Sequence, residues 1–228
     1  MKTLRVLALV GMISLAANLH SNAASLILTP GVPTDLNGSP LDVTYNATSG
    51  SFQVTGSLAD YIDSSDTDTG DFGFYGGYSI SATIDKNTGN VASGGTVTIS
   101  DYESDTLLTG TLESGASGTV WGYYNNSSID QFSFLFAVSG GDVAGDFGGI
   151  GAVCGINLFA DFSGNGGHDT PFAGTWGGNF NNLYNGGAGT GLGYADIFPV
   201  PEPSSILLTL VGGVLCLVAR RRLNAPRA

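Results

Sequence analysis

The chain of 228 residues contains only two cysteines, Cys154 and Cys216. Cys216 lies in an apolar run near the C-terminus, so the rest of the chain cannot close a disulfide within itself. Cys154 lies in the apolar stretch GIGAVCGINLF, where a cysteine usually serves as a small buried hydrophobe. A catalytic thiol would need a nearby histidine, and residues 24–199 offer only His168. The sequence therefore excludes a disulfide-stabilised domain and disfavours a cysteine enzyme.

Basic residues are also scarce, and all but one lie near the two ends of the chain. Residues 24–199 contain one base, Lys86, against eighteen acids, which gives this part a formal charge of −17. A surface with that charge repels nucleic acids and anionic lipid headgroups. We therefore exclude DNA and RNA as partners. The length of this part suits one domain with a core of its own.

No helical periodicity of any length occurs in residues 24–199, and strict alternation of apolar and polar residues takes its place. The alternation is clearest in LDVTYN (41–46), YSISATID (78–85) and QFSFLFAV (131–138), and Gly, Asn and Asp gather between such runs. This period of two is typical of a sheet with one buried face. We count about nine short strands and predict an all-β, antiparallel sandwich or jelly-roll-like domain, with long loops in 140–193.

Long apolar runs occur only at the two ends of the chain. At the N-terminus, Lys2 and Arg5 precede an apolar segment over 6–17, and Ser21-Asn22-Ala23 follows it. A basic segment, an apolar segment and a small-residue cleavage site in this order are typical of a secretory signal peptide. We predict a signal helix in residues 1–23, cleavage between Ala23 and Ala24, and export of residues 24–199.

The apolar run at the C-terminus, Ile206–Ala219, is hydrophobic on all sides. As a helix its fourteen residues would measure about 21 Å, against about 30 Å for the hydrocarbon core of a bilayer. With Ser204 and Ser205 included, 204–219 predicts a marginal transmembrane-type helix. Pro201 and Pro203 prevent the helix from extending upstream, and Arg220–Arg222 fix its far end on the cytoplasmic side.

The C-terminal segment 200–228 resembles a known sorting signal. Its parts are Val200, Pro201, Glu202 and Pro203, then the apolar helix, then Arg220, Arg221 and Arg222. In this order they are similar to the PEP-CTERM protein-sorting signal of Gram-negative bacteria. That resemblance implies recognition by the membrane enzyme exosortase, commonly in organisms that make exopolysaccharide. It implies an inner-membrane-anchored precursor that later reaches the cell surface or extracellular matrix, and it implies no activity for residues 24–199, which look like the uncharacterised β-rich bodies of other such proteins.

Two aspartate-rich stretches have hard oxygen ligands of the kind that calcium prefers. The first offers Asp63, Asp66, Asp68 and Asp71, and the second offers Asp161, Ser163 and Asn165 with Gly166 at the turn position. The twelfth position, normally a bidentate Glu, is Gly77 counted from Asp66 and Phe172 counted from Asp161. We therefore interpret both stretches as solvated acidic loops, and expect no metal and no cofactor.

Other candidates for chemistry are weaker. Glu103 and Glu113 are the only glutamates in 24–199, and a glycan hydrolase would need such a pair across a cleft. His168 beside Asp169 has no serine in a nucleophile motif. Five aromatic residues in Gly- and Asn-rich surroundings could stack on sugars or fill the core: Trp121, Tyr123, Tyr124, Trp176 and Phe180.

The sequence thus favours a non-enzymatic, exported surface or matrix protein associated with exopolysaccharide. A carbohydrate-binding, lectin-like sandwich is the second interpretation, and a glycan hydrolase is the third.

Overall fold

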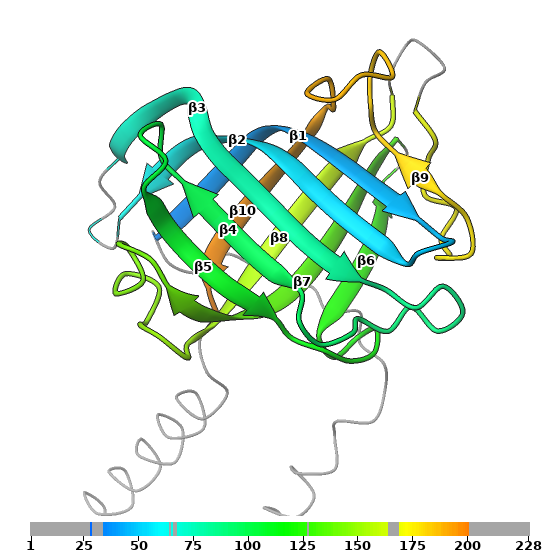
Figure 1. The fold of residues 1–228 in the computed structure, drawn as a ribbon, viewed down its shortest axis with the longest axis horizontal. Coiled ribbons are helices and arrows are strands. Elements are labelled where there is room, and N and C mark those ends of the chain that lie inside the picture. Colours follow the sequence, from blue (N-terminus) through cyan, green and yellow to red (C-terminus); the bar gives the residue numbers. More distant parts are fainter. Residues whose placement is uncertain are drawn as a thin grey trace, which may run out of the picture.

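The computed structural model describes residues 28, 34–63, 65, 68–126, 128–163 and 169–200. In these residues the chain forms ten strands (Figure 1). They are β1 (Asp35–Asn46), β2 (Ser51–Ile62), β3 (Asp68–Thr83), β4 (Thr96–Ser100), β5 (Thr106–Leu112), β6 (Trp121–Asn126), β7 (Ile129–Gly140), β8 (Val153–Asp161), β9 (Phe180–Asn181) and β10 (Gly193–Pro199).

Eight of the strands form a closed antiparallel barrel. Their order is β10-β8-β7-β5-β4-β3-β2-β1, and β1 pairs with β10 to close the ring. β6 pairs with β7, and β9 pairs with β1, outside this ring. The prediction of an all-β antiparallel fold is confirmed, but the prediction of a sandwich or jelly roll is wrong. Because the first strand pairs with the last, all eight strands belong to one closed sheet. In a sandwich they would be divided between two separate sheets.

Alternate residues of each strand point into the barrel and fill it. On β7, Phe132, Phe134 and Phe136 are buried, as the period-two pattern of the sequence predicted. Two glycines make room for large rings inside. A Cβ atom at Gly38 would lie 2.6 Å from the Tyr78 ring, and one at Gly110 would overlap the Phe136 ring. Glycine at these positions lets the rings lie directly against the backbone of the facing strand.

Aromatic rings close one end of the barrel, which we call the aromatic end. Trp176 lies in the loop between β8 and β9, yet only 4% of it is exposed. Its ring centroid lies 5.2 Å from that of Trp121 and 5.1 Å from that of Phe172. Phe180 stacks on Phe132, with centroids 5.7 Å apart. A loop residue therefore belongs to the core.

Two buried polar side chains attach the loop between β9 and β10 to β1. Asn182 accepts a hydrogen bond from Val43 N at 2.7 Å and donates one to Leu41 O at 3.1 Å. Asp42 accepts hydrogen bonds from the backbone N–H groups of Gly189 and Gly191. Because buried amide and carboxylate groups are costly without partners, these bonds fix the loop in one position. They also hold the start of β10 beside β1.

Candidate functional site

The predicted sorting tail begins directly at the rim of the barrel. Pro199, the last residue of β10, pairs with Cys154 of β8, and Val200 N donates a hydrogen bond to Val153 O at 3.2 Å. Pro201–Arg222 follow at once and lie outside the described residues, as do Ala23 and Ala24. No helix in the part of the chain that the structure describes is long and apolar enough to span a bilayer. The predicted signal helix 1–23 and the predicted helix 204–219 lie outside that part.

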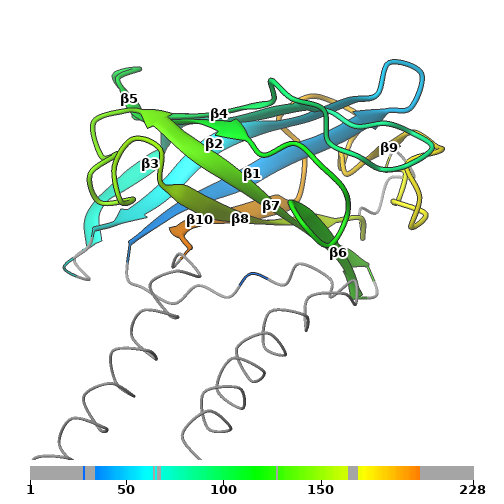
Figure 2. The ribbon, with the colours of Figure 1, turned by 90° about the horizontal axis from the view of Figure 1, so that it is seen from below.

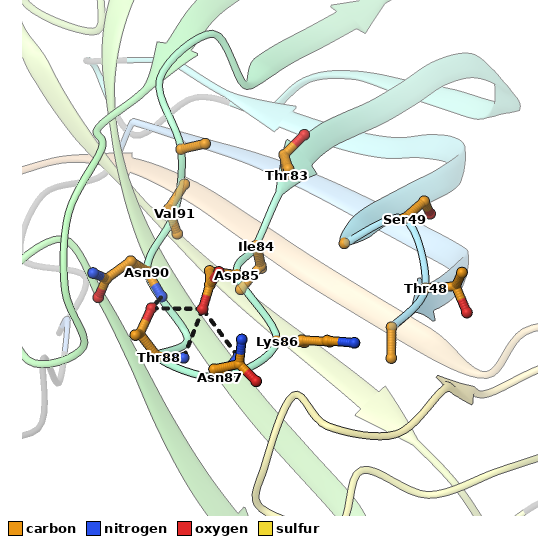
Figure 3. A pocket seen from close by; sticks show the side chains of 13 residues that line it. Thr48, Ser49, Thr83, Ile84, Asp85, Lys86, Asn87, Thr88, Asn90 and Val91 are labelled. Carbon is orange, nitrogen blue, oxygen red and sulfur yellow. Dashed lines mark hydrogen bonds between the residues drawn. The ribbon is translucent and has the colours of Figure 1, made fainter.

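A surface hollow of about 540 Å³ lies at the aromatic end (Figure 3). The β1–β2 turn and the segment that follows β3 line it. Asp85 Oδ1 accepts hydrogen bonds from Thr88 N at 2.8 Å, Thr88 Oγ1 at 2.9 Å and Asn87 N at 3.0 Å, which hold the pKa of this carboxyl below its usual value. Lys86 points from the same turn toward Thr48 and Ser49 (Figure 3). The Asp85 carboxylate accepts hydrogen bonds within the turn, so the remaining polar side chains of the hollow are one lysine, two asparagines and hydroxyl groups.

A smaller hollow of about 260 Å³ adjoins it and shares Lys86 with it. Trp121 and Trp176 line this hollow, and neither indole N–H has a hydrogen-bond partner among the described residues. Gly89 covers them with a positive φ of 70°, and a Cβ there would lie 2.9 Å from the Trp176 ring. Both indoles are more than nine-tenths buried, so they are core side chains beneath a tight turn and give a ligand no exposed platform.

The five aromatic residues singled out in the sequence separate into two groups. Trp121, Trp176 and Phe180 are buried in the core. Tyr123 is half-buried, and its hydroxyl donates to Asp130 Oδ1 at 2.8 Å. Tyr124 is 56% exposed. For most of these rings the packing role is therefore confirmed, and Tyr124 alone of the five is available to a ligand.

The aspartate-rich stretches use their described carboxylates within their own loops. Asp63 Oδ1 accepts a hydrogen bond from Ser65 N at 2.8 Å, and Asp161 Oδ1 accepts one from Ser163 N at 2.7 Å. Asp66, Asn165 and Gly166 lie outside the described residues. Within the described ranges, no group of three or more His, Cys, Asp or Glu residues is placed to hold a metal ion.

The two glutamates do not form a pair. Glu103 precedes β5 and Glu113 follows it, and the seven residues of β5 span about 23 Å. Glycosidase carboxyl pairs lie about 5–10 Å apart.

Cys154 is fully buried, and burial raises the pKa of its thiol to about 12. His168 lies outside the described residues. The two glutamates are therefore not placed as a glycosidase pair, and Cys154 is not placed as a catalytic thiol.

A group of half-buried polar residues on the outer face of the barrel has no counterpart among our sequence predictions. Asn37 of β1 faces Asp60 of β2 on one side and Asp196 of β10 on the other. Its amide nitrogen, oriented as a donor, lies 2.7 Å from Asp196 Oδ1 and 3.3 Å from Asp35 Oδ2. Burial, and then the charge of Asp196, raises the pKa of Asp35 to about 7. Burial also raises the pKa of Asp196.

These carboxyl groups predict that the barrel loses stability as the pH rises toward 8. Because the pKa of Asp35 is higher in the folded chain than the usual 3.8, its contribution is complete below about pH 4 and is lost as the pH rises through about 7. Because water partly reaches this carboxyl, we expect the free energy of unfolding to fall by about 2 kcal/mol over this range. That corresponds to a decrease of about 4–8 °C in Tm.

The measurement is thermal unfolding of the full-length chain and of its Asp35→Asn variant from pH 5 to 8.5. The difference in Tm between the two should change across this range, with the variant gaining relative stability at pH 8. Asp105→Asn, at an exposed turn position, should parallel the unsubstituted chain. A constant difference for Asp35→Asn would contradict the shifted pKa.

Comparison with protein-family models gives a match to the PEP-CTERM protein-sorting motif over residues 199–222. No curated protein and no solved structure matches the chain. The matched range begins at the last residue of β10 and contains the positions predicted for the sorting signal, from Val200 to Arg222. The motif implies export, surface sorting and processing by exosortase. The chain therefore carries a C-terminal PEP-CTERM protein-sorting motif directly after its β-barrel.

Proposed function

We propose that the sorted chain is a non-enzymatic protein of the cell surface or extracellular matrix and that it associates with exopolysaccharide. The observation that carries this proposal is the position of the sorting motif, directly after the last strand of a barrel filled with apolar side chains. Before processing, the tail helix over 204–219 would anchor the precursor in the inner membrane. After processing, the barrel would be the part that remains at the surface.

A carbohydrate-binding, lectin-like barrel is the second candidate, and one observation favours it. Tyr124 of β6 and Tyr194 of β10 are both exposed, and only β7 and β8 lie between these two strands in the sheet. Exposed tyrosines offer flat apolar faces and a hydroxyl, a combination suited to sugars. A glycan hydrolase receives no such support, since Glu103 and Glu113 lie at opposite ends of β5.

Localisation in native cells tests the proposal. The processed protein should be found with the exopolysaccharide on the cell surface or in the matrix, and cells in which exopolysaccharide synthesis is blocked should release it into the medium. The purified protein should leave the chain length of that polysaccharide unchanged over a long incubation. Unaltered retention without the polysaccharide, or shortening of the polysaccharide by the protein, would refute the proposal.

A further inference from the structure

A row of aromatic and amide side chains crosses four neighbouring strands on the outside of the barrel. Tyr124 of β6 faces Gln131 of β7, Gln131 faces Phe159 of β8, and Phe159 faces Tyr194 of β10. Residues directly opposite each other in antiparallel strands point to the same side of the sheet. We call these four residues the aromatic strip. Figure 2 shows β6, β7, β8 and β10 following one another along one side of the barrel.

The strip points outward because its neighbours along each strand point inward. Phe132 on β7 and Leu158 on β8, each next to a strip residue, are fully buried in the barrel. By contrast, 56% of Tyr124 and 43% of Tyr194 are exposed. The strip is therefore an outer surface with accessible rings at both ends.

The middle of the strip is held in place by contacts of its own. The rings of Phe159 and Tyr194 stack, with centroids 4.4 Å apart and planes 12° from parallel. Gln131 Nε2 donates hydrogen bonds to Asn157 Oδ1 at 3.1 Å and Ser133 Oγ at 3.3 Å. These contacts fix the side chains before any ligand arrives, so binding costs little additional side-chain entropy.

The spacing of the strip suits a sugar ring. Adjacent strands lie about 4.8 Å apart. The backbones of Tyr124 and Phe159, which have β7 between them, are therefore about 10 Å apart. One pyranose ring placed above Gln131 could contact both aromatic residues, since van der Waals contact needs about 4 Å on each side. The amide of Gln131 lies beneath that position, where its Oε1 can accept a hydrogen bond from a sugar hydroxyl.

The charge around the strip selects against an acidic ligand. Asp161 lies two residues after Phe159, and Asp196 two residues after Tyr194, so both carboxylates share the outer face with the strip. Residues 24–199 as a whole carry a formal charge of −17. A polyanion would be repelled from this face, while carboxylates can accept hydrogen bonds from the hydroxyls of a neutral sugar.

We propose that the aromatic strip is a binding site for a neutral polysaccharide, with one sugar ring above Gln131 between Tyr124 and Phe159 and the glycan chain continuing toward Tyr194. This proposal rests on the association with exopolysaccharide proposed above and gives that association a location. The barrel interior takes no part, because large side chains fill it.

Affinity electrophoresis of the full-length chain in mild detergent tests the strip, with gels that contain neutral polysaccharides (a glucan, a mannan and a galactan) or alginate as the acidic probe. At least one neutral polysaccharide should retard the chain, and alginate should not. Tyr124→Ala and Tyr194→Ala should each weaken binding about three- to tenfold, as expected for one lost ring contact. Tyr124→Phe, which keeps the ring, should bind within about twofold of the unsubstituted chain.

Tyr102→Ala is the matched control, because Tyr102 is 61% exposed and lies in the turn between β4 and β5, away from the strip. It should bind like the unsubstituted chain. Near-UV circular dichroism must show that all variants keep the fold. Equal losses for Tyr102→Ala and Tyr124→Ala, or retardation by alginate alone, would overturn the strip as the site. If no neutral polysaccharide retards the chain while native cells still retain it through exopolysaccharide, the strip fails and the proposed function stands.

Discussion

A chain that ends at Leu192 is expected to lose cooperative folding, whereas a chain that ends at Val200 is expected to keep it. β10 is the strand that closes the barrel, because it pairs with β8 over Tyr194–Pro199 and with β1 from Leu36 to Leu41. Its removal leaves two strand edges unpaired and uncovers the interior. Unpaired edges of this kind are templates for aggregation.

The loss of apolar contacts points in the same direction. Ile197 of β10 is fully buried and lies between Leu36 of β1 and Ile156 of β8, both of which are also fully buried. Truncation of one large core side chain commonly costs about 2–5 kcal/mol. The truncated chain would lose three buried side chains, Ala195, Ile197 and Phe198, from a domain whose net stability is about 5–15 kcal/mol.

Thermal unfolding of residues 24–200 and residues 24–192, followed by circular dichroism, decides the outcome. The longer fragment should show strand-rich spectra and one cooperative transition, and the shorter one no transition. Two point variants of the longer fragment separate closure from chain length. Ile197→Asp places a charge inside the barrel and should unfold it, while Tyr194→Ser on the outer face should have a small effect. If residues 24–192 unfolded cooperatively at the same temperature as residues 24–200, closure of the barrel by β10 would not be needed for stability.

Most of the strands could be predicted from the sequence, but the closure of the barrel could not, and β8 lies in the range 140–193 where we predicted long loops. The alternation of apolar and polar residues in LDVTYN and QFSFLFAV is a local pattern that can be read from the sequence. These runs form parts of β1 and β7. β10 has only Gly193, Ala195 and Ile197 on its inner face, so its apolar pattern is weak. Its pairing with β1 joins residues about 160 positions apart, and no local signal specifies such a partner. About nine short strands without known partners fit a sandwich as well as a barrel, and we chose the sandwich.

Side-chain placement in loops was equally beyond the sequence. The glycines around Trp176 correctly indicated a loop, but they could not show that the indole turns inward to contact Trp121 and Phe172. The contact of Asp35 with Asn37, and of Asn37 with Asp196, likewise depends on the register of β1 against β10. Once a register is known, the period of two assigns each residue to a face. The aromatic strip became visible in the same way, from three registers read together.

The largest expected effect outside folding is on the sorting tail. In native cells the unsubstituted protein should be recovered without residues 207–222, and the Glu202→Ala variant should be recovered with them and remain in the inner-membrane fraction. The reason lies in the rim of the barrel. Val200 N donates a hydrogen bond to Val153 O, and from the sequence we expect Pro203 to favour an extended conformation at Glu202, the residue before it. In the sequence, Glu202 adds a negative charge two residues after Val200, a feature that hydrophobic anchoring does not require.

Intact-mass measurement of the protein from both strains reads the outcome directly, because cleavage close to Glu202 removes the apolar run and the arginines together. Since β10 ends at Pro199, the substitution leaves every described strand unchanged, so uncut protein should still melt like the unsubstituted barrel. Glu103→Ala, an equal change of charge at the exposed 101–105 turn, should be processed normally. The same C-terminus and the same location for Glu202→Ala and Glu103→Ala would mean that hydrophobicity alone governs the tail. A mass that still includes residues 207–222 for Glu202→Ala alone would mean that an enzyme recognises the acidic residue between the two prolines before the barrel is released.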